Sequence, residues 1–224
     1  PRTLRYEIDA SLDAALHEVT ATGRLTWRND ASRPAEEMRL HLYLNAFRDE
    51  KSTFLREAKS HRGSEYDASR PGSIELLSFR EEAGEERVAK AKFVAPDDAN
   101  PDDRTVLAVP LEHAVAPGES RTFLLSWKTK LPKVFARAGY AGDFHMVAQW
   151  FPKVARLEPT GEWRHFPFYH LTEFYSDFGT YDVTLDVPAG PVAGAARTRR
   201  SGSTVQGREV ALKTIEPEVF RDPE

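Results

Sequence analysis

The sequence predicts an all-β protein, folded as an antiparallel, saddle-shaped sandwich with few or short helices. Apolar residues recur at every second position through much of the chain, which is typical of strands with one buried face. Turn-forming residues separate these runs, as at Asn29-Asp30 and Pro117-Gly118. Many short strands with few helices are typical of sandwiches rather than α/β folds.

The alternation is clearest near the N-terminus, where Val19, Ala21, Leu25 and Trp27 share one face of a run. The segments predicted as strands are, in chain order, residues 4–12, 17–27, 38–44, 73–79, 88–94, 105–109, 120–130, 181–187 and 205–212. One helix or helical turn is expected after Asn45, over residues 50–60.

The composition excludes several functional classes. The 224 residues are 40% hydrophobic and 29% charged with a net charge of −4, which favours a soluble globular chain without a basic nucleic-acid face. No apolar run reaches the length of about 18 residues that a membrane-spanning helix needs. The absence of cysteine excludes disulfides, thiolate metal sites and cysteine nucleophiles. It leaves the compartment open, although a periplasmic or secreted location is favoured for the full protein.

The chain shows no catalytic constellation of its own. It contains no G-x-S-x-G, P-loop, G-x-G-x-x-G or H-E-x-x-H motif. His165 and His170 are five residues apart, which places them on opposite faces of a strand, so a metal site with Glu173 is the weaker interpretation. The acidic residues 96–103 faintly resemble a calcium loop. However, Asp103 stands where such a loop needs glycine, and a solvated loop is the better interpretation.

Aromatic residues are concentrated in residues 135–181, which hold 13 of the 24 in the chain. Polar side chains lie among them, including Gln149, Lys153 and Arg156. A thick aromatic core would explain this concentration. A docking surface for another domain or a ligand would explain it equally well, because aromatic and polar groups are enriched together at interfaces.

Five phrases of this sequence, in fixed order, resemble the N-terminal domain of bacterial aminopeptidase N-like (gluzincin) zinc metallopeptidases. They are Leu40-His41-Leu42-Tyr43-Leu44-Asn45-Ala46-Phe47, Gln149-Trp150-Phe151-Pro152-Lys153, Gly161-Glu162-Trp163, Glu173-Phe174-Tyr175-Ser176-Asp177-Phe178-Gly179 and Tyr181-Asp182-Val183. The resemblance spans most of the chain and is strongest over residues 149–188. In one respect the chain departs from aminopeptidase N itself: Phe166-Pro167 is followed by Phe168, and the family's acidic run is absent. Exopeptidase specificity is therefore not implied.

The resemblance implies a saddle-shaped domain over residues 1–190, with residues 191–224 supplying its last strands and running toward a missing catalytic domain. That domain, in the same protein, is expected to bind zinc through an H-E-x-x-H helix, whereas no metal, cofactor or catalytic residue is expected in this part. The expected partners are the catalytic domain and a peptide substrate. In the family, a glutamine or glutamate at the position of Gln149 helps bind the α-amine of the substrate. The physics suits this role, because an amide oxygen accepts hydrogen bonds from an ammonium without adding a buried charge. A glutamine bonded to neighbouring strand backbone is the other interpretation.

Two alternatives from other classes remain. The main alternative is a stand-alone β-sandwich that binds carbohydrate or protein through residues 135–181. A weaker alternative is a scaffold domain in a multi-domain transporter or membrane protease.

Overall fold

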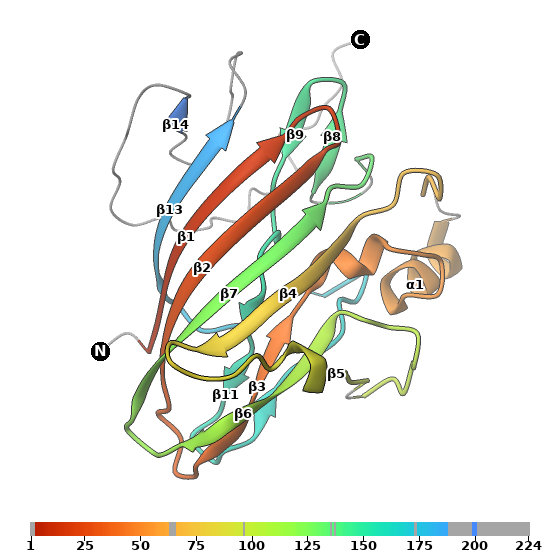
Figure 1. The fold of residues 1–224 in the computed structure, drawn as a ribbon. Helices are drawn as coiled ribbons and strands as arrows, with labels where there is room; N and C mark the ends of the chain where they lie inside the picture. Colours follow the sequence, from red (N-terminus) through yellow and green to blue (C-terminus); the bar gives the residue numbers. More distant parts are fainter. Residues whose placement is uncertain are drawn as a thin grey trace.

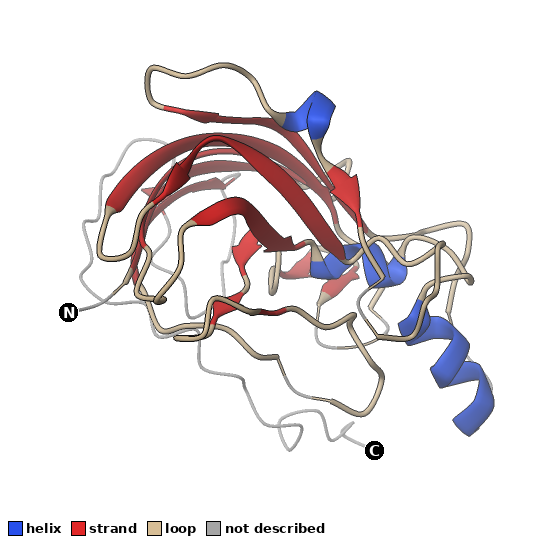
Figure 2. Cartoon of the chain, turned by 90° about the horizontal axis from the view of Figure 1, so that it is seen from below, coloured by secondary structure: helices blue, strands red, loops and turns tan. Residues whose placement is uncertain are grey.

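The structure is a computed structural model that describes residues 3–62, 66–95, 97–134, 136, 138–172, 174–187 and 199–200. Two β-sheets dominate it, and the larger one arches over the rest of the chain (Figures 1 and 2). The all-β prediction is confirmed, because strands form both layers and the helices are short.

The larger sheet has six strands in the order β14-β13-β1-β2-β7-β4 (Figure 1). They are β1 (Leu4–Asp13), β2 (Glu18–Arg28), β4 (Ser73–Glu81), β7 (Ser120–Lys130), β13 (Thr180–Val187) and β14 (Arg199–Arg200). Strands β1, β2, β7 and β4 are antiparallel neighbours, with Leu4 opposite Trp27 where β1 meets β2. In β1 the buried and less buried residues alternate, as the sequence pattern predicts.

The smaller sheet has four strands in the order β10-β3-β6-β5. They are β3 (Ala35–His41), β5 (Lys92–Phe93), β6 (Val106–Val115) and β10 (Lys153–Val154). Two further hairpins pair β8 (Gly139–Ala141) with β9 (Phe144–Met146), and β11 (Arg156–Leu157) with β12 (Trp163–Arg164). The helical elements are η1 (Tyr43–Phe47), α1 (Thr53–Arg62) and η2 (Val88–Lys90).

The hydrophobic core includes the inward faces of both sheets. Leu25, Phe79 and Phe123 of the larger sheet and Met38 and Val109 of the smaller sheet are all buried in one cluster. Burial of apolar side chains between two sheets is the main stabilising contribution in such a sandwich.

Most predicted strands are confirmed, with three corrections in the described part of the chain. The predicted strand 38–44 ends at His41, and the chain turns into η1. Buried Asn45 stabilises this turn, because its side-chain nitrogen donates to the Arg104 carbonyl (2.8 Å) and its oxygen accepts from the Ile74 backbone N–H (2.9 Å). The predicted strand 88–94 is instead η2 followed by the short β5. The predicted helix 50–60 begins only at Thr53.

The sheet pairing also departs from a purely antiparallel sandwich. Strand β13 lies parallel to β1, with Arg5 opposite Thr180 and Ser11 opposite Asp186. Alternation within a strand fixes which face is buried but carries no information on the direction of its neighbour. Strand β14 pairs in parallel with β13 at its other edge.

The domain boundary near residue 190 stays a prediction. The predicted strand 205–212 and most of residues 191–224 lie outside the described residues. In the part that is described, no helix has both the length and the apolar character needed to cross a bilayer.

Candidate functional site

The segment that carries Gln149 is fixed against the larger sheet by buried side chains. Trp127 Nε1 and Thr129 Oγ1 of β7 both donate to the Trp150 carbonyl oxygen, at 3.1 and 2.7 Å. Trp127, Thr129 and Trp150 are themselves buried. Both lone pairs of this carbonyl are therefore used, which holds the residue after Gln149 rigidly in place.

A second attachment joins this segment to β1 at Pro152, two residues after Trp150. The hydroxyl of fully buried Tyr6 donates to the Pro152 carbonyl oxygen at 2.9 Å and accepts from the Val154 backbone N–H at 3.0 Å. The Tyr6 ring also packs edge-on against Phe151 at 5.2 Å. Burial raises the pKa of the Tyr6 hydroxyl well above its usual range, so it remains protonated as a donor. The two attachments bind residues 150–154 of the chain to β1 and β7.

Gln149, the predicted substrate-binding residue, has two unusual features. Its φ of 51° lies in the left-handed region, which a side chain with a Cβ seldom adopts. Its Oε1 is buried and has no hydrogen-bond partner in the part of the chain that the structure describes. A buried acceptor without a partner costs about 1–3 kcal/mol of folding free energy, so the position of the Gln149 oxygen is unfavourable for stability.

A buried lysine–histidine pair adjoins the same segment. Lys153 of β10 stands directly opposite His41 of β3 in the antiparallel register. Both are nearly inaccessible, with exposed fractions of 7% for Lys153 and 1% for His41. The ammonium of Lys153 lies 5.8 Å from the Phe174 ring centre and 5.9 Å from that of Tyr43, within the range of cation–π attraction. Tyr43 is buried as well.

Burial shifts the titration of both groups. Desolvation, followed by the nearby Lys153 and His165, lowers the pKa of His41 to about 3, so this imidazole is neutral at pH 7. Desolvation also lowers the pKa of Lys153 to about 8, which leaves it mostly protonated at pH 7. Both ring nitrogens of His41 are buried and have no hydrogen-bond partner within the described residues.

A cavity of about 170 Å³ opens next to His41. Its walls are mostly aromatic and come from the start of η1 and from the loop before β13, including Tyr43, Phe168 and Phe174. Phe168 packs on both Tyr43 and Phe174, with ring centres 5.6 and 4.7 Å apart. The walls are therefore held by ring–ring contacts rather than by flexible aliphatic chains.

The aromatic segment divides between core and surface, so a core explains only part of the concentration. Trp150, Phe151 and Phe168 are buried in the core. In contrast, Phe178 is 93% exposed, and Tyr175, Phe166 and Phe144 are also exposed. The loop before β13 carries four exposed hydrophobic side chains, which we call the 166–178 surface: Phe166, Leu171, Tyr175 and Phe178.

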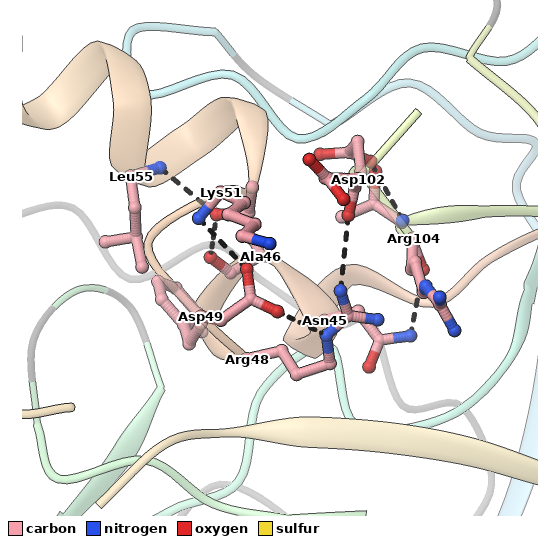
Figure 3. A network of polar contacts seen from close by, with 12 residues as sticks. Asn45, Ala46, Arg48, Asp49, Lys51, Leu55, Asp102 and Arg104 are labelled. Carbon is pink, nitrogen blue, oxygen red and sulfur yellow. Dashed lines mark hydrogen bonds and ion pairs between the residues drawn. The ribbon is translucent and has the colours of Figure 1, made fainter. Parts of the chain in front are cut away.

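The acidic loop has a structural role within the described residues. Asp103 Oδ2 accepts from the Thr53 backbone N–H at the start of α1 (3.0 Å), and Asp98 accepts from the Thr53 hydroxyl. Asn100 donates to the Lys51 carbonyl (2.9 Å), and Figure 3 shows the surrounding network of Asn45, Arg48, Asp49 and Asp102. Carboxylates at a helix N-terminus satisfy its free N–H groups. Asp98 and Asp103 therefore serve as contacts for the start of α1.

The histidines do not form a metal centre in the part of the chain that the structure describes, where no group of three His, Asp or Glu side chains converges. His165 Nδ1 donates to the Trp163 carbonyl at 2.8 Å, and the His170 backbone N–H donates to Glu57. Glu173 lies outside the described residues. His17 and His145 share a contact of 2.9 Å between Nδ1 and Nε2, with His17 stacked on Tyr140, but two imidazoles alone leave a zinc site incomplete.

The sequence predicts a role for Gln149 but does not predict the His41–Lys153 pair. Lys153 belongs to the same quoted phrase as Gln149, and His41 belongs to the earlier one. Their proximity depends on the pairing of β3 with β10, which are more than 100 residues apart in sequence, as their register shows. No local pattern predicts such a pairing.

No protein-family model and no curated protein matches the chain. Among solved structures, the chain is similar to an M1 zinc metallopeptidase from Deinococcus radiodurans, with 14% identity, a TM-score of 0.41 and coverage of 84% of this chain and 33% of that chain. A mutant from the same organism bound to a Tyr-Ser-Ala substrate gives 17% identity, a TM-score of 0.41 and the same coverage of 84% and 33%. A mutant two-domain M1 zinc metallopeptidase bound to L-arginine gives 14% identity and a TM-score of 0.42, covering 84% and 34%. The chain spans about a third of the length of these solved structures.

Proposed function

We propose that this chain is the non-catalytic N-terminal domain of an aminopeptidase N-like zinc metallopeptidase. In that role it shapes one wall of the active-site cleft and helps bind the N-terminus of the peptide substrate. The observation that carries the proposal is Gln149: a side-chain oxygen that is buried without a partner, on a segment that buried hydrogen bonds fix to the core.

The proposed chemistry of Gln149 is recognition rather than catalysis. Its amide oxygen accepts a hydrogen bond from the substrate α-ammonium and so positions the scissile peptide bond. Because the backbone on either side of Lys153 is tied to Tyr6, the segment that carries the acceptor is held at a fixed place before the substrate arrives. Such preorganisation lowers the entropy lost on binding.

Zinc is expected in the catalytic domain of the same protein and not among the described residues, which hold no group of three His, Asp or Glu side chains. When bound there, zinc supplies a Lewis acid and an activated water. The contribution of this chain is to hold the peptide in place. The 166–178 surface is the proposed contact with the catalytic domain, because apolar surface rimmed by polar groups is typical of docking sites.

The kinetic test uses the complete enzyme and a series at Gln149. Gln149→Ala removes the acceptor, and a hydrogen bond to a charged group contributes about 1.5–3 kcal/mol, so kcat/KM for peptides with a free α-amine should fall roughly tenfold to a hundredfold. Gln149→Glu keeps an acceptor and should retain more of the activity. Glu36→Ala, an exposed change on β3, is the matched control and should leave kcat/KM unchanged. An unchanged kcat/KM in Gln149→Ala would contradict the role of Gln149 in binding the substrate α-amine.

A second test separates the metallopeptidase from a stand-alone β-sandwich that binds carbohydrate or protein. The reading frame beyond Glu224 is read for an H-E-x-x-H motif about 100 residues further on. Its presence supports the peptidase. A stop codon at that point supports the binding module, for which the exposed aromatic side chains of the 166–178 surface provide the contact area.

A further inference from the structure

The β8–β9 hairpin contacts the turn between β1 and β2 through a pair of histidines. Nδ1 of His17, in the turn, lies 2.9 Å from Nε2 of His145 in β9. The His17 ring also stacks on Tyr140 of β8, with ring centres 3.4 Å apart and planes at 10°. The backbone of His17 is itself fixed, because its carbonyl accepts from the Leu131 N–H at 2.9 Å. His17 therefore joins the hairpin to an edge of the larger sheet that is distant in sequence.

The hairpin is too short to be stable without such contacts. Strands β8 and β9 have three residues each, and a lone two-stranded hairpin is at best marginally stable in water. The backbone of Tyr140 bonds to Pro132 and Val134, which ties β8 to the preceding segment. Among the described residues, β9 pairs with no strand other than β8. The bond between His17 and His145 is thus a direct link from β9 to the β1–β2 turn.

The tautomers of this pair follow from a third contact. His145 Nδ1 lies 3.1 Å from the Asp143 carbonyl oxygen, and a carbonyl only accepts, so this nitrogen carries the proton. In a neutral imidazole the other nitrogen is then an acceptor. His145 Nε2 therefore accepts from His17 Nδ1–H, and Nε2 of His17 is left without a proton.

This bond depends on how many protons the pair holds. A first additional proton can bind Nε2 of His17, which leaves the Nδ1–H donor and the His145 acceptor unchanged. A second must bind Nε2 of His145, so that two N–H groups face each other at 2.9 Å and both rings are positive. The doubly protonated pair has no hydrogen bond and repels itself, whereas the neutral and singly protonated pairs keep the bond.

The surroundings place this second protonation below the ordinary histidine range. Desolvation, and then the neighbouring His145, lower the pKa of His17; Asp13 opposes this effect and Lys130 adds to it. The Asp13 carboxylate is already used as an acceptor for two backbone N–H groups of the turn, at 2.9 and 3.0 Å. On the hairpin side, Asp143 contacts the pair through its carbonyl. Both imidazoles are therefore charged only well below pH 6.5, the ordinary histidine pKa of about 6.5 being the reference.

We propose that the His17–His145 bond is an acid-sensitive clasp, which holds the β8–β9 hairpin to the β1–β2 turn at neutral pH and releases it when both imidazoles are protonated. Strand β9 ends at Met146, three residues before Gln149, so release also loosens the chain that leads into Gln149. That consequence for substrate binding rests on the proposed function, whereas the clasp itself does not.

The test is NMR relaxation of the 224-residue chain at pH 7 and at pH 4.5, with circular dichroism to follow the fold. At pH 7 we expect a nuclear Overhauser effect between the His17 and Tyr140 rings and backbone order parameters of about 0.85 in β8 and β9. At pH 4.5 the ring contact should be lost and the order parameters of β9 should fall below about 0.6, while those of β2 and β7 stay unchanged.

Two variants separate the clasp from other effects of acid. His145→Gln keeps an acceptor for His17 Nδ1–H and binds no proton, so its hairpin should stay ordered at pH 4.5. His145→Ala removes the acceptor, so its hairpin should have low order parameters at both pH values. The matched control His113→Gln, an exposed histidine of β6, should behave as the unaltered chain does.

Three outcomes would overturn the proposal: a hairpin that keeps its order at pH 4.5, a chain that loses its β2 and β7 order together with the hairpin, or equal loss of order in His145→Gln. None of these readouts involves peptide cleavage. Failure of the clasp would therefore leave the proposed role of Gln149 to its own kinetic test.

Discussion

The hydroxyl of Tyr6 offers the sharpest test of how the candidate site is held. It bridges the Pro152 carbonyl and the Val154 N–H, two backbone groups on either side of Lys153. Tyr6→Phe removes this one oxygen and keeps the ring, which packs against Phe151 and Tyr181. The substitution therefore isolates the hydrogen bonds from the packing.

The expected destabilisation follows from what the substitution leaves behind. It strands a buried carbonyl and a buried N–H, and each unsatisfied group costs about 1–3 kcal/mol. Because Tyr6 is 1% exposed, water cannot readily replace the hydroxyl. We expect a total loss of about 2–4 kcal/mol in the free energy of unfolding. With a urea m-value of about 2–3 kcal/mol/M, this corresponds to a decrease of about 1 M in the midpoint.

The assay is equilibrium urea unfolding followed by tryptophan fluorescence, with Tyr181→Phe as the matched control. Tyr181 stacks on Tyr6 with ring centres 5.5 Å apart, and no hydrogen bond of its hydroxyl is found within the described residues. Its removal should change the free energy of unfolding by less than about 0.5 kcal/mol. A Tyr6→Phe midpoint within 0.2 M of the unaltered chain would refute the view that this hydroxyl anchors residues 150–154.

Two further predictions concern stability. Ala99 has a left-handed φ of 52°, so Ala99→Gly should stabilise the chain by about 0.5–1 kcal/mol. The control Ala91→Gly, at a φ of −72°, should destabilise the chain. A lower urea midpoint for Ala99→Gly would contradict this reasoning. The pKa of His41 is lowered to about 3 in the folded chain, against about 6.5 in the unfolded chain. Between these two pH values the unfolded chain binds a proton at His41 and the folded chain does not. The free energy of unfolding therefore falls as the pH decreases from 6.5 toward 3. Between pH 6.5 and 5 this amounts to about 2 kcal/mol, and urea midpoints should fall less steeply with acidity in His41→Phe; identical slopes would show that His41 does not contribute.

Much of the fold could be predicted because its strands follow local rules. The alternation of β1 and β2 appears in the sequence, and the structure buries the predicted faces. The short strands of residues 139–164 were not predicted, because two or three residues are too few to show a period. The end of β3 at His41 was missed for a related reason: Asn45 stabilises the turn through groups on β4 and the Arg104 loop, which are distant in sequence.

The candidate site was predictable only in part. Gln149 followed from the family resemblance of its phrase, whereas its left-handed backbone and its unpartnered oxygen could be seen only in three dimensions. The burial of His41 and Lys153 likewise depends on the pairing of β3 with β10. In a sequence, a lysine between aromatic residues suggests a solvated charge, because lysine is rarely buried without a partner.

Buried polar side chains in this chain differ in whether they have hydrogen-bond partners. Buried Asn29 uses its side chain for three backbone partners, at Ala31, Arg33 and Val115, which is what a purely structural polar residue requires. Gln149 and His41 break this rule, and both adjoin the same short stretch, since Gln149 precedes Lys153 by four residues and His41 lies opposite it. Folding selects against unpaired buried groups, so those that persist are expected where binding, rather than stability, determines the residue. Because Gln149 and His41 both adjoin one rigidly anchored segment, we propose this segment as the place of ligand recognition.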